Sequence, residues 1–175
     1  RPRSLRHEVR LARQVRLVHH AVPLDHRPVN GARLVRKDLH QHAVNAAWFD
    51  ENMKKRDFYV AVADGTPVGT LTLQFFGEYT YLGYVYIDTA HVGNGYGRKL
   101  LEFAARESKN RGMKGMVLIA HPQASWAIKA YQKFGFKLAH RDKDDILAWN
   151  GGVLKPYYEE YFQLFMYDLD KKPTP

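Results

Sequence analysis

The chain contains no cysteine, which excludes disulfides, thiolate metal ligands and a cysteine nucleophile. It also has no apolar run close to the roughly 20 residues that a membrane-spanning helix needs, and no repeat or low-complexity tract. Hydrophobic residues nevertheless make up 45% of its 175 residues, which is enough to build a core. We therefore expect a single domain over residues 1–175, located in the cytoplasm and not associated with membranes.

Acidic residues are scarce in the first segment. Residues 1–37 hold ten Lys or Arg against Glu8 and Asp25, which gives +8 of the chain's total charge of +9. Such a segment can be a targeting or expression-derived extension, or it can bind nucleic acid. From residue 9 to residue 17, however, the odd positions are apolar except at Arg13, and Arg10, Gln14 and Arg16 alternate with them, as in a half-buried strand. No nucleic-acid motif accompanies the basic cluster, so we favour an ordered first strand over a nucleic-acid partner.

The remaining pattern alternates between strands and helices. Asp64-Gly65 lies between two β-rich runs, 57–63 and 68–76, and predicts a hairpin. Apolar periodicity predicts further strands at 81–88, 115–120, 136–141 and 161–169, and helices at about 34–51, 96–111 and 124–134. The wholly apolar run 115–120 is typical of a strand that is covered on both faces. This order predicts an α/β protein with a mixed sheet.

The stretch HVGNGYGRKLL, residues 91–101, has glycines at 93, 95 and 97, after a predicted strand and at the start of a predicted helix. Glycines there leave unpaired backbone N–H groups accessible, and the helix dipole adds positive potential, so the turn can bind a phosphate or pyrophosphate. A P-loop would need Gly-Lys-Ser/Thr, and a dinucleotide fold would need these glycines after its first strand. Neither motif fits, and the glycines can also serve only a tight turn.

Together with the hairpin, the buried strand and the helix ending in AIKAYQKFGFK, this turn resembles the GNAT superfamily of acyl-CoA-dependent N-acyltransferases. The resemblance covers almost the whole chain and rests on two motifs, at 92–97 and 124–136. Val92 stands where the family usually has Arg or Gln, and Ala124 stands where it usually has Asn. The resemblance implies a GNAT-like, mostly antiparallel central sheet flanked by helices, with the strands at 81–88 and 115–120 splayed apart.

The resemblance also implies acetyl-CoA as the cosubstrate. Backbone amides of the turn would hold its pyrophosphate, and a side chain at 98 or 99 would neutralise remaining charge. Backbone groups near the end of the preceding strand would pair with the pantetheine arm, and Ser125 or Gln123 could replace the missing asparagine. The implied cofactor-binding residues are Tyr86, Ile87, Asp88, Val92, Gly93, Asn94, Gly95, Tyr96, Gly97, Arg98, Lys99 and Ser125.

Acyl transfer to an amine requires a proton donor for the leaving thiolate and a way to deprotonate the amine. Tyr131 aligns with the family tyrosine that protonates the thiolate, and a phenol keeps its proton at neutral pH. For the base we rank Glu78 ahead of His121, with Asp88 a further candidate. Each can instead be structural: Tyr131 and His121 in packing, Glu78 in a solvated loop and Asp88 in a cap.

The segment between the last two strands is aromatic and acidic, as expected for an acceptor site that attracts a cationic amine. Its candidate residues, which can equally seal the core, are Trp149, Tyr157, Tyr158, Glu159 and Glu160. We expect an N-acetyltransferase that transfers an acetyl group to a small-molecule or peptide primary amine by direct attack on the thioester.

The alternative function is a catalytically degenerate acyl-CoA-binding protein, or a regulatory or nucleic-acid-binding one. The apolar run 161–169 could pair across a homodimer. We expect no metal, because four histidines of the first 42 residues lack nearby carboxylates at ligand spacing and lie far from the proposed site in the sequence; they are His19, His20, His40 and His42.

Overall fold

The computed structural model describes residues 9–13, 51–52 and 54–170. The predicted helix at 34–51, the first-segment histidines and most of the Arg-rich segment therefore lie outside the described residues, apart from the helical Glu51. The strands are β1 Val9–Arg13, β2 Asp57–Ala63, β3 Thr66–Phe76, β4 Tyr79–Ile87, β5 Gly115–Ala120, β6 Lys137–His140 and β7 Gln163–Asp168. The α-helices are α3 Tyr96–Asn110, α4 Ser125–Phe134 and α5 Lys143–Ala148, and the 3₁₀ turns are η1 Thr89–His91, η2 Trp149–Gly152 and η3 Lys155–Tyr157.

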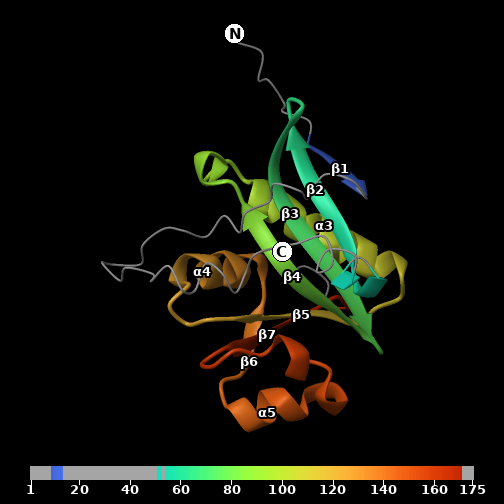
Figure 1. Ribbon diagram of the computed structural model, residues 1–175, viewed down its shortest axis with the longest axis vertical. Helices are drawn as coiled ribbons and strands as arrows, with labels where there is room; N and C mark the ends of the chain where they lie inside the picture. Colours follow the sequence, from blue (N-terminus) through green and yellow to red (C-terminus); the bar gives the residue numbers. More distant parts are fainter. Residues whose placement is uncertain (1–8, 14–50, 53, 171–175) are drawn as a thin grey trace. The chain divides into compact units, whose positions relative to one another are not determined.

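The seven strands form one hydrogen-bonded order, β1-β2-β3-β4-β5-β7-β6, which can be followed in Figure 1. β4 and β5 pair in parallel, whereas β1–β2, β5–β7 and β6–β7 are antiparallel. This confirms the predicted mixed, mostly antiparallel sheet. The first strand is also confirmed, over Val9–Arg13, by its pairing with β2.

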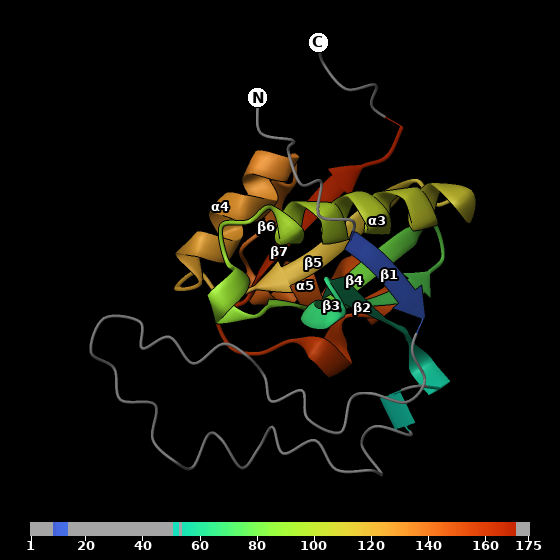
Figure 2. The same cartoon turned by 90° about the horizontal axis from the view of Figure 1, so that it is seen from above.

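The chain divides into two compact units, and each unit is built from two separate stretches of the sequence. Unit 1 comprises residues 1–72 and 84–100, and unit 2 comprises residues 73–83 and 101–175. The boundaries fall inside β3, β4 and α3, and Figure 2 shows α3 as one continuous helix.

In unit 1, the hairpin turn predicted between β2 and β3 is confirmed. Asp64 and Gly65 have φ values of 50° and 79°, as a type I′ turn requires at both central residues. Gly69 marks a close approach of β3 to β4, because a Cβ placed on it would lie 2.7 Å from the carbonyl oxygen of Tyr86. The sequence pattern did not predict that Gly69 is required there.

In unit 2, the strand β5 is covered on both faces, as its apolar sequence predicted. Val117 packs with Tyr81 and Leu164 against Ile146 and Leu154, which come from the β6–β7 connection. The alternate residues Met116 and Leu118 are buried as well, because successive side chains of a strand point to opposite faces. Figure 1 shows α4 on one side of β5 and β7 and α5 on the other.

The β6–β7 connection is more structured than predicted. It contains α5, η2 and η3, whereas the sequence indicated only a long connection. Asp142 caps α5 by accepting the Asp144 N–H at 2.9 Å, and Ile146 has no exposed surface. Such a short helix depends on its cap and on its packing, and neither gives a long periodic pattern.

The prediction that the last strand pairs across a homodimer is wrong. β7 lies between β5 and β6 and pairs with β5 from Gln163 to Asp168 and with β6 from Leu164 to Met166. Both edges of β7 are therefore occupied, and it offers no free edge to a second chain.

Candidate cofactor turn and acyl-transfer site

The glycine turn has a backbone that requires glycine at two of its three glycine positions. Gly93 and Gly95 have φ values of 90° and 80°, and no atom lies within 4 Å of a Cβ placed on either. Gly97 has no left-handed φ, and a Cβ placed on it would make an ordinary van der Waals contact with Ile87 Cγ1 at 3.8 Å. The turn therefore has a left-handed backbone at Gly93 and Gly95, and the space above both glycines is open.

The helix α3 begins directly after this turn. Lys99 donates its N–H to the carbonyl of Gly95 at 3.1 Å, which starts the helical hydrogen bonds. The amides of Tyr96 and Gly97 precede that bond and lie at the positive end of the helix dipole. A turn of this kind can hold an anion through backbone groups alone, so Val92, whose side chain is 48% exposed, need not contribute its side chain.

Asp88 occupies the cap of η1. Its carboxylate accepts the Ala90 N–H at 3.3 Å and the His91 Nδ1 proton at 2.8 Å. The hydrogen bond from His91, followed by that from Ala90, holds the pKa of Asp88 below its usual value. Its own N–H donates to the Val68 carbonyl at 3.0 Å. These bonds support the capping alternative for Asp88 over the role of base, and they identify His91 as a contact that the sequence did not predict.

The strand β4 leaves its ladder with β5 after three positions, Tyr79 to Tyr81. Within unit 1, Tyr84 then takes a φ of 46°, a bulge-like value for a bulky residue, and its carbonyl accepts the Thr70 hydroxyl at 3.2 Å. The N–H of Asp88 donates to Val68 in β3. Because the backbone groups of successive strand residues point to opposite edges of the strand, those of Ile87 and Val85 point away from β3. Of the three residues predicted for pantetheine, Ile87 has the suitable backbone direction, while Asp88 and Tyr86 face β3.

In unit 2, α4 carries Tyr131 and Ser125. Tyr131 is half-buried, and its ring meets Phe136 edge-on at 6.0 Å. Gly135, with a φ of 124°, ends the helix as predicted, and its N–H returns to the Tyr131 carbonyl. Ala124 is the N-cap without any side-chain capping bond, and Ser125 is the exposed first residue of the helix.

The two leading candidates for the base lie at opposite ends of β5. Glu78 is exposed, forms an ion pair with Lys114, and accepts the Lys114 N–H through its carbonyl at 2.8 Å, just before β5 begins. His121 follows the last residue of β5, about 20 Å further along a six-residue strand. Glu78 is therefore paired with a cation beside the start of β5, and its role as the base stays a prediction.

His121 is held in one orientation. Its Nδ1 accepts the Gln123 N–H at 3.2 Å, and its ring meets Tyr161 and Phe162 edge-on at 6.2 Å each. An imidazole that accepts at Nδ1 carries its proton on Nε2 when it is neutral. His121 therefore presents an N–H donor from Nε2, rather than the lone pair that a base needs.

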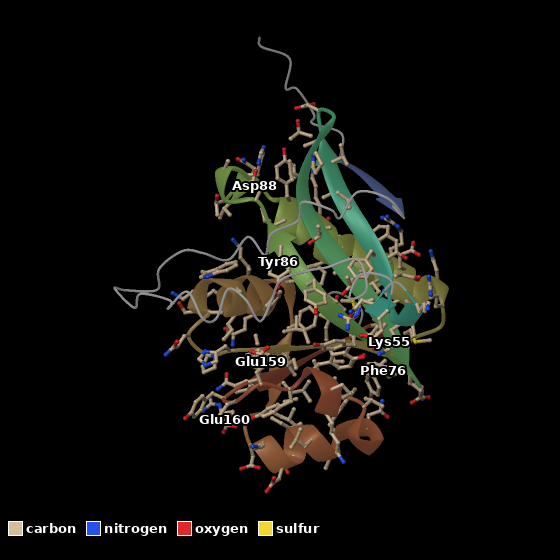
Figure 3. All side chains as sticks on the ribbon, in the orientation of Figure 1. Lys55, Phe76, Tyr86, Asp88, Glu159 and Glu160 are labelled. Atoms are coloured by element: carbon tan, nitrogen blue, oxygen red, sulfur yellow. The ribbon has the colours of Figure 1, made fainter. Side chains whose placement is uncertain are left out.

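The residues predicted for the acceptor separate into two groups. Trp149 meets Tyr79 at 5.2 Å, and Tyr157 stacks on Tyr81 at 5.1 Å. Glu160 instead forms an ion pair with Lys143 at 3.2 Å, and Lys143 also lies over Tyr158. In Figure 3, Glu159 and Glu160 lie apart from Phe76, which packs against the same core cluster as Trp149, Tyr157 and Tyr158. Glu160 already has a cationic partner in Lys143, and the aromatic–carboxylate acceptor site stays a prediction.

Among the described residues, no group of three or more His, Asp or Glu side chains could hold a metal ion. None of the described helices has both the length and the apolar character to cross a membrane.

The family model described as acetyltransferase (GNAT) family matches residues 29–136, which is more than half of the chain. The chain belongs to this family. As a GNAT-family member it is an acyltransferase of the acetyl-CoA-dependent class. No curated protein matches the chain at a significant level.

Solved structures share the GNAT fold. A GNAT acetyltransferase from Staphylococcus aureus Mu50 has a TM-score of 0.66 at 15% identity, covering 93% of this chain and 100% of that one. One from Elizabethkingia anophelis with acetyl-CoA bound has a TM-score of 0.60 at 15% identity, covering 91% and 97%. A Bacillus anthracis protein in complex with acetyl coenzyme A has a TM-score of 0.53 at 23% identity. That match spans 65% of this chain and 62% of the other, less than two thirds of its length.

Proposed function

We propose that this GNAT protein transfers the acetyl group of acetyl-CoA to a primary amine by direct attack of the amine on the thioester. The observation that carries the proposal is the turn at 92–97, whose two left-handed glycines leave open space at the start of α3. A pyrophosphate suits that turn, because it supplies the charge that backbone amides and the helix dipole attract.

In the proposal, the amides from Val92 to Arg98 hold the pyrophosphate, and Lys99 neutralises part of its charge. Backbone groups of Ile87, with those of Val85, pair with the pantetheine arm. This choice is supported by the strand alternation that follows from the bond between Asp88 and Val68. Ser125 remains a proposed contact at the first turn of α4.

The reaction needs one proton at the sulfur and releases protons from the nitrogen. The neutral amine forms a bond to the thioester carbon, the C–S bond then breaks, and the Tyr131 hydroxyl gives its proton to the departing thiolate. We assign no side chain as the base, because Glu78 is paired with Lys114 and Nδ1 of His121 is occupied. The acceptor binds as the neutral amine, and after the attack its nitrogen loses a proton to solvent, from which Tyr131 regains the proton that it gave.

This assignment makes a kinetic prediction. Without an enzymatic base, the logarithm of kcat/KM for the amine should rise with a slope of about one per pH unit up to the pKa of the amine itself. The measurement is a pH–rate profile with two amines of different pKa. A bend at the same pH for both amines would instead identify an enzyme group as the base.

The cofactor site is tested by calorimetric titration of acetyl-CoA, with ATP and NAD titrated alongside as other phosphate-containing nucleotides, at moderate salt so that the basic first segment does not imitate binding. We expect selective binding of acetyl-CoA. Equal binding of all three, or none, would oppose the proposal. Selective binding without thiol release in an amine screen would support the degenerate acyl-CoA-binding alternative.

Gly95→Ala tests the turn directly, and Gly65→Ala is a matched control. Both glycines have a φ close to 80° with nothing within 4 Å of an added Cβ, so the backbone strain is the same. We expect Gly95→Ala to weaken acetyl-CoA binding about tenfold or more, because the methyl group would enter the space of the pyrophosphate, while Gly65→Ala leaves affinity unchanged. Equal losses in both variants would mean that the turn does not contact the cofactor.

Further assignments rest on the same proposal. The acceptor is a small molecule or a peptide amine, the chain forms one domain in the cytoplasm, and any homodimer uses a surface other than β7.

A further inference from the structure

The side chain of Gln74 in β3 is buried but only partly satisfied. It is 4% exposed, and its Nε2 donates to the Tyr157 hydroxyl oxygen at 2.9 Å. Its Oε1 is buried and has no hydrogen-bond partner. An unpaired buried acceptor is unfavourable, and a binding partner for it is therefore expected.

Two further aromatic rings pack against Tyr157, the hydrogen-bond partner of this amide. Tyr157 stacks on Tyr81, with ring centroids 5.1 Å apart and planes at 28°, and it lies 6.3 Å from Phe76. Phe76 and Tyr81 are in turn 6.3 Å apart and stacked. We call Gln74, Phe76, Tyr81 and Tyr157 the Gln74 cluster. Its amide and rings can recognise a ligand that combines a flat apolar body with an N–H donor.

The cluster is attached to the end of β3, and two of its rings reach the surface. Asn150 donates from Nδ2 to the Phe76 carbonyl at 3.3 Å, which attaches the β6–β7 connection to the end of β3. Phe76 and Tyr157 are both only half-buried, so their rings keep surface in contact with solvent. In Figure 3, Phe76 lies apart from Glu160, whose carboxylate is already paired with Lys143. Recognition here therefore depends on ring stacking and on the uncharged hydrogen-bond acceptor of Gln74, rather than on a free carboxylate.

We propose that the Gln74 cluster is the subsite for the amine acceptor, and that the acceptor is an arylalkylamine-like molecule. Its aromatic body lies against Phe76 and Tyr157, and an N–H of the molecule donates to Oε1 of Gln74. Because Oε1 is covered in this structure, binding requires the Tyr157 side chain to shift. This inference rests on the proposed function and specifies its substrate class.

The test compares 2-phenylethylamine with n-butylamine as acceptors in a thiol-release assay. The wild-type protein should have a KM for 2-phenylethylamine about tenfold below that for n-butylamine, since only the former makes the aromatic contact, and a factor of ten corresponds to about 1.4 kcal/mol. Gln74→Leu should raise the KM of both amines, because both donate an N–H to Oε1, and Tyr157→Phe, which keeps the ring but not the anchor of the amide, should raise both by less.

Thr80→Val is the matched control. Thr80 lies in the same hairpin, has no exposed surface and also has an unpaired buried oxygen, but as the neighbour of Tyr81 it faces the other side of the sheet. Thr80→Val should leave the KM values of both amines unchanged. Equal KM values for the two amines in the wild type, or equal effects of Gln74→Leu and Thr80→Val, would show that the cluster only packs the core.

Failure of the inference and failure of the proposed function give different results. Each variant is also titrated with acetyl-CoA, whose affinity should stay at the wild-type value. Acetyl-CoA binding and thiol release without aromatic preference would overturn the subsite alone. If the wild type binds no acetyl-CoA, the proposed function fails, and calorimetric titration of 2-phenylethylamine into wild type and Gln74→Leu still decides whether the cluster binds it.

Discussion

At the scale of single residues, Asp88 links the pH of the solution to the turn that precedes the glycines. Its carboxylate is bonded to His91 and to the Ala90 N–H, and the pKa of Asp88 is lowered for that reason. A carboxyl whose pKa is lower in the folded state adds stability above its unfolded pKa of about 3.9. That stability is lost as the pH falls through the lower, folded value.

Asp88→Asn should therefore reduce the free energy of unfolding at neutral pH, because asparagine can still cap η1 but offers His91 an uncharged and therefore weaker hydrogen-bond acceptor. The difference from wild type should shrink below pH of about 4 and disappear once Asp88 is protonated in the folded protein. Urea unfolding at a series of pH values measures it. Parallel curves for the two proteins down to the lowest pH would show that the bond to His91 adds no stability.

Residue identity predicted the glycine turn well, and the general base poorly. Alternate glycines at a strand-to-helix junction depend on local backbone geometry, which the sequence encodes directly, and Gly93 and Gly95 have the left-handed φ values that favour glycine. The role of Glu78 depends on Lys114, a residue 36 positions away whose place beside it follows from strand pairing. The orientation of His121 depends likewise on a tertiary arrangement that periodicity does not reveal.

At the scale of elements, periodicity located β2, β5 and α4 to within a residue, because each has a clear pattern and a turn residue at its end. It missed α5, η2 and η3 in the β6–β7 connection. Their sequences are short, acidic and aromatic, and they are ordered by packing on the sheet. The position of β7 between β5 and β6 could not be read from order along the chain either, since strand neighbours are set by tertiary pairing.

The helix α4 allows a prediction about capping. Ala124 is its N-cap and makes no side-chain capping bond, while its carbonyl accepts the Ile128 N–H at 3.0 Å. Ala124→Asn should raise the free energy of unfolding by about 0.5–1 kcal/mol, because an asparagine can accept an N–H of the first turn.

Thermal and urea unfolding measure this gain, with Ser125→Ala as the control at the exposed neighbouring position. Asparagine is also the residue that the GNAT pattern usually has there, so acetyl-CoA affinity should rise in the same variant. A lower midpoint of unfolding for Ala124→Asn than for wild type would mean that the backbone at this position cannot use a cap.

At the scale of the whole molecule, the two compact units are joined without a linker, because β3, β4 and α3 each contribute residues to both. We therefore expect residues 1–175 to unfold as one cooperative domain. Gly69→Ala tests this from unit 1, since its Cβ would lie 2.7 Å from the Tyr86 carbonyl and 2.8 Å from Ile87 Cδ1. Such crowding should lower the free energy of unfolding by about 1–3 kcal/mol.

The readout comes from unit 2, which contains Trp126 and Trp149, in a Trp48→Phe background that removes the third tryptophan of the chain. If the chain is one domain, Gly69→Ala lowers the urea midpoint seen by tryptophan fluorescence as much as that seen by circular dichroism. Gly115→Ala, whose Cβ would meet the Tyr167 carbonyl at 2.9 Å within unit 2, should shift both signals in the same way. A fluorescence midpoint that responds to Gly115→Ala but not to Gly69→Ala would mean two independently folding domains, because the strain in unit 1 would then not reach unit 2.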